Sequence, residues 1–232
     1  MHLSEWTIVC DFDGTIVADD VIDVLLRRFG RSGWEQLEAD WRAGRIGSRE
    51  CMSGQVALLD MDCAQLDACL ADFHVDTAFG QFVETAHDNG VPVCIASDGL
   101  DYAISAILER HALHDLTFAA NHLVPNGPRA WQLTSPFQRP ACQSGTCKCA
   151  VVERSRRAGE KVLLVGDGAS DFCAAEQVDL VFGKPKLAQF CRAHHVPHVS
   201  VDDFDDATAA LRQLLDREAD GNQFAAQVAL SV

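Results

Sequence analysis

Four short apolar runs stand out along the chain, and each is followed at once by glycine, serine or aspartate. They are WTIVC at 6–10, VPVCIAS at 91–97, KVLLVGDG at 161–168 and VDLVFG at 178–183. Apolar runs of this length, bounded by turn residues, are typical of strands buried on both faces of a sheet. We therefore expect buried strands whose polar residues gather where the strands end.

Segments with a helical spacing of apolar residues lie between and after these runs. They are YAISAILERHA at 102–112, CAVVERSRRAG at 149–159 and ATAALRQLLDRE at 207–218. This alternation predicts an α/β fold, a Rossmann-like doubly wound parallel sheet with helices on both faces. In such folds ligands bind beyond the carboxyl ends of the strands, which is where the polar clusters of this sequence fall.

The alternation is interrupted after the first strand. Four segments with helical spacing follow one another without a clear strand, at 21–30, 34–46, 49–60 and 64–73. We interpret residues 16–78 as a helical cap inserted into a core formed by residues 1–15 and 79–232. The turn-rich stretch 117–147 predicts a hairpin near Asn126 and Gly127, and beyond Asp216 the pattern predicts only the fraying end of a helix.

Composition and charge narrow the classes of partner. With 232 residues and 48% apolar content, the chain can bury one substantial core, or one core with a smaller satellite domain. The 34 acidic and 19 basic residues give a formal net charge of -15, which argues against nucleic acids and anionic membranes as partners because both require a basic face. An anionic substrate must therefore meet a local cluster of positive charge.

The N-terminal segment and the cysteines indicate the compartment. The segment MHLSEWTIVCDFDGT has neither a basic start nor an apolar stretch long enough for a signal peptide or membrane span, so we expect a cytoplasmic protein. The ten cysteines are scattered, and several lie in apolar runs. Reduced thiols in the core are therefore expected for most of them rather than a disulfide scaffold.

The first strand ends in a pair of carboxylates, Asp11 and Asp13, and Gly14 and Thr15 then supply a turn. Like charges held this close are unfavourable unless a cation compensates them, and hard oxygen ligands are those that Mg²⁺ takes. The alternative for such a pair is a helix N-cap. A second pair, Asp167 and Asp171, follows the strand at 161–168 in the segment GDGASD.

Two further groups at strand ends or helix starts suit a bound phosphate. Ser97 follows a strand and precedes a helix expected near Asp101, so its hydroxyl and the neighbouring N–H groups suit an anion, although a plain Ser N-cap is the alternative. Lys148 begins the expected helix at 149–159 after a loop of small residues. Lysines are normally solvated, but in this acidic chain a cation at the same sheet edge can neutralise a phosphoryl oxygen.

In order, the motifs are DFDGT, SDG, a lysine and GDGASD. With them the chain resembles the haloacid dehalogenase superfamily of phosphatases in all four motifs, over nearly its whole length. The insert after the first motif is placed like the helical cap of the phosphoserine-phosphatase-like branch. The segment CQSGTCKC is similar to the phosphatases of methionine salvage that act on 2-hydroxy-3-keto-5-methylthiopentenyl-1-phosphate. Gly14 and Asp20 stand where serine-specific relatives have serine and glutamate, which argues against phosphoserine as the substrate.

The resemblance implies a mechanism with a role for each motif. Asp11 would be the nucleophile that forms an aspartyl-phosphate, and Asp13 the general acid and then the base. A Mg²⁺ cofactor would be held in the group Asp11, Asp13, Asp167 and Asp171, with Asp13 contributing its backbone carbonyl and Asp171 orienting Lys148 or a metal-bound water. Phosphate or substrate contacts would come from Ser97, Asp98, Gly99, Lys148 and Asp20.

Other functions are also compatible with the same residues. Phosphoserine is the alternative substrate, and a phosphomutase or phosphotransferase would keep all four motifs but pass the phosphoryl group to another hydroxyl. Non-catalytic zinc binding through Cys142, Cys147 and Cys149 is a weaker alternative, because their spacing lacks paired C-x-x-C knuckles. We interpret the stretch CRAHHVPH as a helix end that enters an edge strand rather than as a metal site. The exact substrate, the oligomeric state and the roles of Asp19 and Asp20 are not determined by the sequence.

Overall fold

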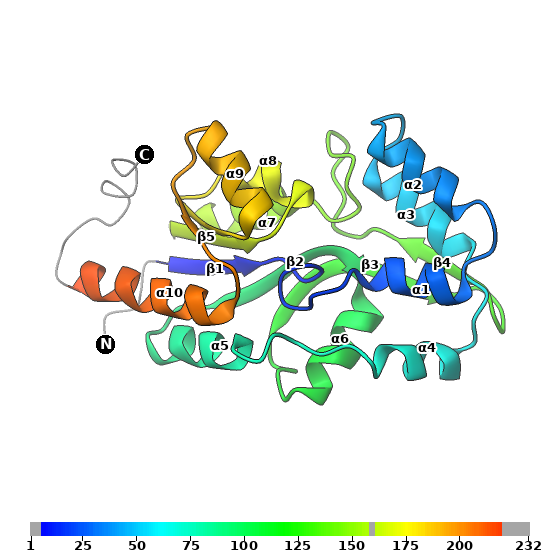
Figure 1. The fold of residues 1–232 in the computed structure, drawn as a ribbon, viewed down its shortest axis with the longest axis horizontal. Helices are drawn as coiled ribbons and strands as arrows, with labels where there is room; N and C mark the ends of the chain where they lie inside the picture. The colour runs from blue at the N-terminus through cyan, green and yellow to red at the C-terminus, as the bar shows by residue number, and fades with distance from the viewer. Residues whose placement is uncertain (1–5, 158–160, 220–232) are drawn as a thin grey trace. The chain divides into compact units, whose positions relative to one another are not determined.

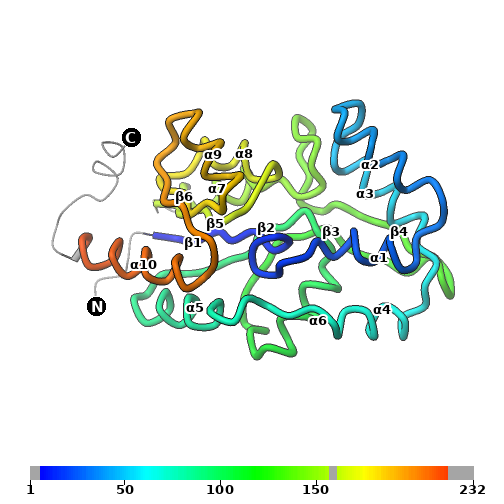
Figure 2. The backbone as a smooth tube through the Cα atoms, in the orientation of Figure 1, coloured from blue at the N-terminus to red at the C-terminus, as the bar shows by residue number. Residues whose placement is uncertain are grey.

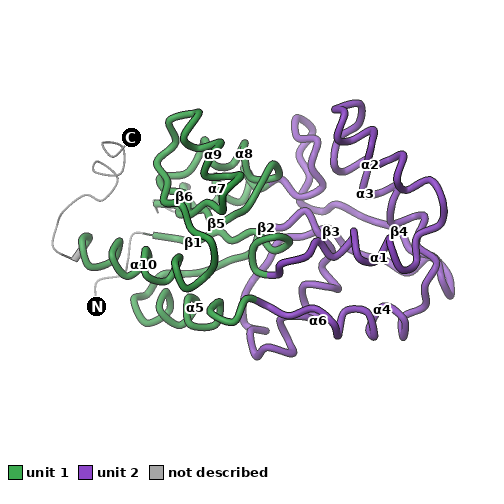
Figure 3. The backbone as a smooth tube through the Cα atoms, viewed as in Figure 1, with its two compact units in different colours: residues 1–16, 76–96, 148–232 green, residues 17–75, 97–147 purple. Residues whose placement is uncertain are grey.

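The computed structural model describes residues 6–157 and 161–219. The chain divides into two compact units, shown in different colours in Figure 3. The first contains residues 1–16, 76–96 and 148–232, and the second contains residues 17–75 and 97–147. The helical insert expected at 16–78 thus lies almost entirely in the second unit, together with a stretch that the sequence assigned to the core. A cap that closes over a substrate stays a prediction.

The first unit is built around a mainly parallel sheet. Its strands are β1 (Trp6–Cys10), the first half of β2 (Val93–Leu100), β5 (Lys161–Gly166), β6 (Leu180–Gly183) and β7 (His198–Ser200). The seven strands found among the described residues follow the order β4-β3-β2-β1-β5-β6-β7, with β1 paired in parallel to both β2 and β5. The register places Cys10 opposite Ile95 on one side and Val165 on the other. The carboxyl ends of β1 and β5 therefore lie side by side.

Helices cover both faces of the sheet in the first unit. In Figures 1 and 2, α7 (Lys148–Arg157), α8 (Phe172–Ala175) and α9 (Pro185–Ala193) lie on one face, and α5 (Phe79–Asp88) and α10 (Phe204–Ala219) on the other. On the first face Val9, Val162 and Leu164 pack in one core cluster with residues of these helices. On the other face, Phe204 makes edge-on ring contacts with Phe79 and Phe82. The α/β class with a parallel sheet is confirmed.

The second unit is built from helices and a hairpin. Its helices are α1 (Val21–Phe29), α2 (Trp34–Arg42), α3 (Ser48–Ala57), α4 (Cys63–Leu70) and α6 (Asp101–Arg110). The hairpin consists of β3 (Thr117–Pro125) and β4 (Trp131–Thr134), which pair antiparallel as the turn at Asn126 and Gly127 predicts. Trp131 is buried and donates from its indole nitrogen to the carbonyl of Met61, which ties the hairpin to the residues just before α4.

Local sequence explains where several of these helices begin. Asp20 is the N-cap of α1 and accepts from the backbone N–H of Asp23 at 3.2 Å. Asp62 and Gln65 form a capping box at α4, in which each side chain accepts from the backbone of the other residue. Such caps satisfy N–H groups that have no partner within the helix. The starts of α1 and α4 are therefore specified by local sequence.

One predicted boundary and one unpredicted helix differ between the sequence pattern and the structure. The second strand continues to Leu100, so Ser97 lies within β2 rather than after it, while α6 begins at Asp101 as expected. Helix α5 was not predicted, because FGQFVETAHD has fewer apolar positions than its neighbours. The stretch CRAHHVPH does run from the end of α9 into β7, as expected. Residues after 219 lie outside the described part of the chain.

No helix in the described part of the chain has the length and apolar character needed to cross a membrane.

Candidate active site

Asp11 is delivered to the sheet edge by β1. Its backbone N–H donates to the carbonyl of Val165 at 2.8 Å, which continues the pairing of β1 with β5 by one residue. Its side chain is buried, and one carboxylate oxygen accepts the N–H of Phe12 at 2.8 Å. The chain then turns sharply, because the N–H groups of Thr15 and Ile16 both donate back to the carbonyl of Phe12. The carboxylate is therefore fixed in direction.

Asp171 lies at the corresponding edge of β5, at the end of a short 3₁₀ turn (Ala169–Asp171). Its side chain is completely buried, and one oxygen accepts the N–H groups of Asp167 and Gly168, each at 3.2 Å. A Cβ on Gly166 would lie 2.5 Å from that oxygen, so glycine is required there for the carboxylate to reach the backbone. The GDGASD motif thus folds onto its own last residue.

Lys148, the first residue of α7, links these two carboxylates. Its Nζ lies 2.6 Å from an oxygen of Asp11 and 2.6 Å from an oxygen of Asp171, and its side chain is only 3% exposed. Ser170 completes the group, since its hydroxyl lies 3.1 Å from Nζ and 3.2 Å from the same oxygen of Asp11 that the lysine contacts. Three distant stretches of sequence therefore meet in one buried ionic cluster. Ser170 was not singled out by the sequence, although it lies inside the motif.

The pKa values in the cluster reflect its burial and its excess of negative charge. Burial acts to lower the pKa of Lys148, but the charges of Asp11 and Asp171 outweigh burial and raise it above its usual value, so the ammonium stays charged. Burial, with the charge of Asp11, raises the pKa of Asp171 to about 7. The same two causes raise the pKa of Asp167, against the pull of nearby lysines. Keeping all three carboxylates ionised together is therefore unfavourable without a further cation.

A divalent cation suits this donor set. One carboxylate oxygen each from Asp11, Asp167 and Asp171 lies within 4.8 Å of the others, the single such cluster of potential ligands found among the described residues. Oxygen ligands from carboxylates are what Mg²⁺ takes. Among the residues that the structure describes, Cys142, Cys147 and Cys149 do not form such a group of three ligand atoms. The donor chemistry and the raised pKa values both fit a Mg²⁺ ion held beside the buried lysine.

The turn after Asp13 is shaped by two contacts. Gly14 has a φ of +73°, and a Cβ there would lie 2.9 Å from the carboxylate of Asp167. Lys184 donates to the carbonyls of Gly14 and Thr15 at 2.9 and 3.1 Å. Asp13 itself is half-buried in this turn. The turn is therefore held closely against the end of β5.

Asp98 organises the second unit around the end of β2. Its carboxylate accepts the hydroxyl of Ser48 at 2.6 Å, the N–H groups of Gly145 and Thr146 at 2.8 and 2.9 Å, and the amide of Asn121 at 3.1 Å. These donors come from α3, from β3 and from the loop that precedes α7. Sequence patterns did not identify Ser48 or Asn121, because only the fold brings them to Asp98.

The two neighbours of Asp98 interact with each other. Ser97 is 1% exposed, and its hydroxyl oxygen accepts the N–H of Gly99 at 2.9 Å. Asp20 is exposed and caps α1, as described above. Ser97, Asp98, Gly99 and Asp20 all belong to the second unit, whereas Asp11, Asp13, Lys148, Asp167 and Asp171 belong to the first. Roles for the second set in substrate binding stay predictions.

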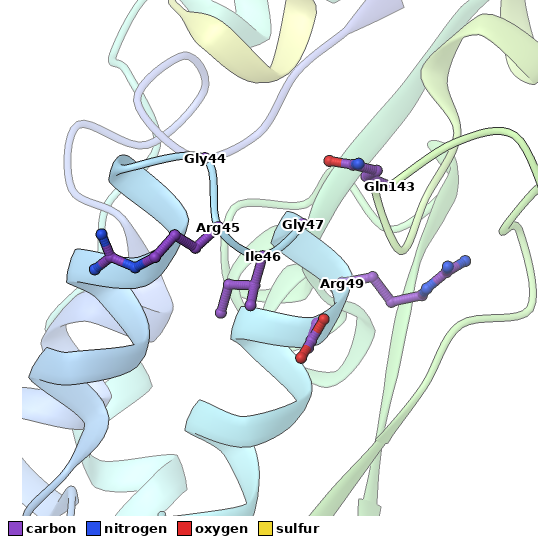
Figure 4. Close-up of a pocket in the computed structure, with 7 residues that line it drawn as sticks. Gly44, Arg45, Ile46, Gly47, Arg49 and Gln143 are labelled. Atoms are coloured by element: carbon purple, nitrogen blue, oxygen red, sulfur yellow. The ribbon is translucent and has the colours of Figure 1, made fainter.

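A small pocket of about 200 Å³ lies on the second unit, and its lining is drawn in Figure 4. It is formed by the turn between α2 and α3 with Gln143 opposite. The side chains of Arg45 and Arg49 extend in opposite directions. Arg45 pairs with Asp40, and Arg49 donates to Gln138 at 2.6 Å. Both guanidinium groups thus have protein partners, and the pocket contains none of the predicted site residues.

The comparison with protein families decides the identity of the fold. A model of the haloacid dehalogenase-like hydrolases matches residues 8–176, well over half of the chain. This chain belongs to the haloacid dehalogenase-like hydrolase family. The match begins in β1 and ends after α8, so it includes every residue of the buried ionic cluster. The resemblance drawn from the four motifs is confirmed.

Relatives of this hydrolase include named phosphatases. The 2-hydroxy-3-keto-5-methylthiopentenyl-1-phosphate phosphatase of an Exiguobacterium species is 26% identical over 213 residues, which cover 88% of this chain and 96% of the relative. The protein of the same name from Geobacillus kaustophilus is 28% identical over 218 residues, which cover 88% and 94%. These alignments span nearly the whole of both proteins.

Solved structures of phosphoserine phosphatases share the fold of this hydrolase. A phospho-aspartyl intermediate analogue of phosphoserine phosphatase aligns with a TM-score of 0.68 at 18% identity, covering 92% of this chain and 98% of that one. A probable phosphoserine phosphatase from Vibrio cholerae aligns with a TM-score of 0.69 at 17% identity, covering 92% and 66%. At this level of identity the likeness establishes the fold alone.

Proposed function

We propose that this hydrolase is a Mg²⁺-dependent phosphatase, which transfers the phosphoryl group of a small phosphorylated metabolite to Asp11 and then to water. The observation that carries the proposal is the buried ion cluster, in which Lys148 lies 2.6 Å from both Asp11 and Asp171. Phosphoryl transfer needs little covalent chemistry from the protein and much positioning and charge neutralisation. A fixed carboxylate beside a buried ammonium supplies both.

Asp11 acts as the nucleophile. Its carboxylate needs no base to attack phosphorus, and the N–H of Phe12 and the hydroxyl of Ser170 hold its two oxygens in place. Lys148 stays charged and neutralises phosphoryl oxygens as the bond to the leaving group breaks. Asp171 positions that ammonium, since its other oxygen is anchored by two backbone N–H groups.

Asp13 acts as general acid and then as general base. It lies in the turn two residues beyond the nucleophile, where it is half-buried. In the first step it donates a proton to the leaving oxygen, and in the second it accepts one from the water that hydrolyses the aspartyl-phosphate. The same carboxyl thus returns to its starting protonation state after each turnover.

Asp11, Asp167 and the backbone carbonyl of Asp13 are the groups that would hold Mg²⁺. The close approach of Asp167 to Gly14 supports this assignment, because it brings the carboxylate to the turn that contains Asp13. When bound, the ion reduces the repulsion between the attacking carboxylate and the phosphate dianion. Lys184 contributes by holding the carbonyls of Gly14 and Thr15, which keeps the turn in shape.

Ser97 and the backbone around Asp98 and Gly99 are proposed to bind phosphoryl oxygens. Ile95, two residues before Ser97, pairs with Cys10, the residue before Asp11. The oxygen of Ser97 accepts the N–H of Gly99, which fixes the hydroxyl group near the end of β2. Asp98 acts indirectly, through the loop that it holds.

The substrate we propose is 2-hydroxy-3-keto-5-methylthiopentenyl-1-phosphate. The support is the set of relatives that carry this name and align over 94% or more of their own length. Asp20, at the start of the helical insert, is the residue we assign to a contact with the leaving group. We also propose that the enzyme acts in the cytoplasm.

Release of inorganic phosphate from a panel of phosphorylated metabolites tests the activity. We expect Asp11→Asn to lower kcat by roughly 10³-fold or more, because the amide cannot form the aspartyl-phosphate. Asp88→Asn serves as a control, since that carboxylate is exposed and lies at the end of α5. An Asp11→Asn protein that keeps more than a tenth of the activity would contradict the mechanism.

The same panel tests the substrate. We expect the methionine-salvage enol phosphate to have the highest kcat/KM, and preference for phosphoserine would instead make this chain a phosphoserine phosphatase. Transfer of the phosphoryl group to a second sugar hydroxyl, without release of phosphate, would indicate a phosphomutase. Each outcome leaves the nucleophile assignment testable by the Asp11→Asn variant.

A further inference from the structure

Two thiols of the first unit lie in contact beside the ionic cluster. The Sγ atoms of Cys149 and Cys173 are 3.4 Å apart, with the thiol of Cys149 donating to the sulfur of Cys173. Cys149 is half-buried in the first turn of α7, and Cys173 is exposed in the first turn of α8. The sequence had grouped Cys149 with Cys142 and Cys147, whereas the fold places it against a cysteine 24 positions further on.

The distance between these thiols is close to that of a disulfide. The sulfur atoms must approach by roughly 1.4 Å, from 3.4 Å to about 2.05 Å, for a bond to form. Both side chains stand at the starts of helices, where small changes of side-chain torsion and of the first turn can supply this movement. The exposure of Cys173 gives a small oxidant access to one of the two sulfurs.

The pair is joined through the backbone to the residues of the site. Cys149 directly follows Lys148, and Cys173 is two residues beyond Asp171. Lys148 and Asp171 are themselves in contact at 2.6 Å, so the two thiols flank this ion pair. A shift of about 1 Å in a positioning group is enough to slow an enzymatic step by roughly 10²-fold. Formation of a bond between the two sulfurs is therefore expected to shift Lys148, which lies next to the proposed nucleophile Asp11.

We propose that Cys149 and Cys173 form a reversible disulfide that lowers the activity of this enzyme when a hydroperoxide is present. The disulfide itself is independent of the proposed function, and its effect on activity rests on that function. Its consequence follows from position, because the new bond ties the start of α7 to the start of α8 and displaces Lys148 from Asp11. Reduction restores the thiols and the original spacing.

The oxidation uses hydrogen peroxide or another hydroperoxide as the two-electron oxidant. The thiolate of Cys173 attacks one peroxide oxygen, an S–O bond forms, the O–O bond breaks, and hydroxide leaves. The sulfur of Cys149 then attacks the sulfenic sulfur, the S–S bond forms, the S–O bond breaks, and the oxygen leaves as water after taking up the thiol proton. A dithiol reductant reduces the disulfide back to two thiols by thiol–disulfide exchange, and the reductant is itself oxidised to a disulfide.

The test exposes the full-length native protein to hydrogen peroxide and follows intact mass and phosphate release together. We expect a mass decrease of about 2 Da, a cross-linked peptide pair containing Cys149 and Cys173, and at least a tenfold loss of activity reversed by dithiothreitol. Cys149→Ser and Cys173→Ser should have wild-type activity before treatment and keep it afterwards. Cys63→Ser, which removes an exposed thiol of the second unit, should respond like the wild type.

The outcomes separate this proposal from the proposed function. A reduced protein that releases no phosphate from any substrate overturns the function, whereas the mass measurement still reports the disulfide. A protein that keeps all its thiols under peroxide overturns the disulfide. Disulfide formation with unchanged activity, or equal inactivation of the Cys173→Ser variant, overturns the switch.

Discussion

Two glycines allow the carboxylates of the site to approach the backbone. Gly166 leaves space for the carboxylate of Asp171, and Gly14 leaves space for that of Asp167. Gly14 also adopts a positive φ of +73°, which side chains with a Cβ rarely adopt. Steric fit and backbone conformation therefore both require glycine at position 14, and the two requirements can be separated by mutation.

Gly14→Ala is expected to lower activity far more than a glycine mutation that imposes the same backbone strain elsewhere. The added Cβ would lie 2.9 Å from Asp167, so that carboxylate must move, and we expect kcat to fall by roughly 10²-fold. Gly90→Ala is the matched control, because Gly90 has a φ of +71° and nothing within 4 Å of its Cβ position.

Both variants should lose about 1–2 kcal/mol in the free energy of unfolding, measured by urea denaturation, because both force alanine into the left-handed region. Equal activity of the two variants would show that contact with Asp167 is unimportant, and that strain alone explains the glycine.

At the scale of elements, the loop between β4 and α7 depends on one side chain. Asp98 receives two N–H groups from this loop, at Gly145 and Thr146, and the hydroxyl of Ser48 at the start of α3. The loop runs directly into Lys148 at the first turn of α7. A carboxylate in β2 thus connects the helical insert, the hairpin strand and the segment that carries the lysine.

Asp98→Ala is expected to destabilise the protein and to impair catalysis. Two partly buried N–H groups lose their acceptor, which should cost about 2–4 kcal/mol in the free energy of unfolding. Asp98→Asn should recover part of this loss, since its amide oxygen still accepts. Asp115→Ala, at a carboxylate that is 98% exposed, is the control and should change neither quantity.

Measurements of kcat and KM distinguish an effect of the loop between β4 and α7 on catalysis from an effect on stability alone. At temperatures where Asp98→Ala is fully folded, we expect kcat to fall about tenfold while the Asn variant stays closer to wild type. A folded Asp98→Ala protein with unchanged kcat and KM would show that the loop does not affect the lysine.

At the scale of the whole molecule, a strongly acidic chain places three of its four lysines where they act on one carboxylate of the site. The formal net charge is -15, yet Lys148, Lys184 and Lys186 all act on Asp167. Their attraction opposes the burial that raises its pKa. The site can therefore accept both a divalent cation and a phosphate dianion within an otherwise repulsive field.

Mg²⁺ is expected to stabilise the native protein in proportion to its occupancy. Binding at 100 times the dissociation constant should add about 2.7 kcal/mol to the free energy of unfolding, seen as a rise in Tm, because the unfolded chain does not hold the carboxylates together. Asp167→Asn should lose most of this rise, and Asp88→Asn should keep it. A Tm that does not respond to Mg²⁺ in the wild type would contradict the metal assignment.

The buried strands, most helices and the chemistry of the four motifs were predictable because their signals are local. Apolar runs specify β1, β5 and β6, and helical spacing specifies α6, α7 and α10, without reference to distant residues. The hairpin turn at Asn126 and Gly127 is similarly local. The true end of β2 was missed because SDG has the composition of a loop, and pairing within the sheet extends the strand through it.

Contacts between distant residues could not be predicted from local patterns. The sequence motifs predicted that Asp11, Lys148 and Asp171 belong to one site. The distances between these side chains depend on the pairing of β1 with β5 and on where α7 begins. Ser170, Ser48 and Asn121 carry no distinctive local pattern, and they matter only because of what they contact. The contact of Cys149 with Cys173 could not be predicted either, because Cys149 was grouped with the cysteines that lie close to it in the sequence.

By itself, then, the sequence determined the α/β class, the family and the residues that carry the chemistry, because apolar periodicity and short motifs are properties of neighbouring positions. The tertiary structure alone decided that Lys148 is buried between two carboxylates, that Asp98 is a structural anchor, and that two thiols flank the ion pair. Those facts depend on strand register and helix packing, which bring together side chains that are far apart along the chain.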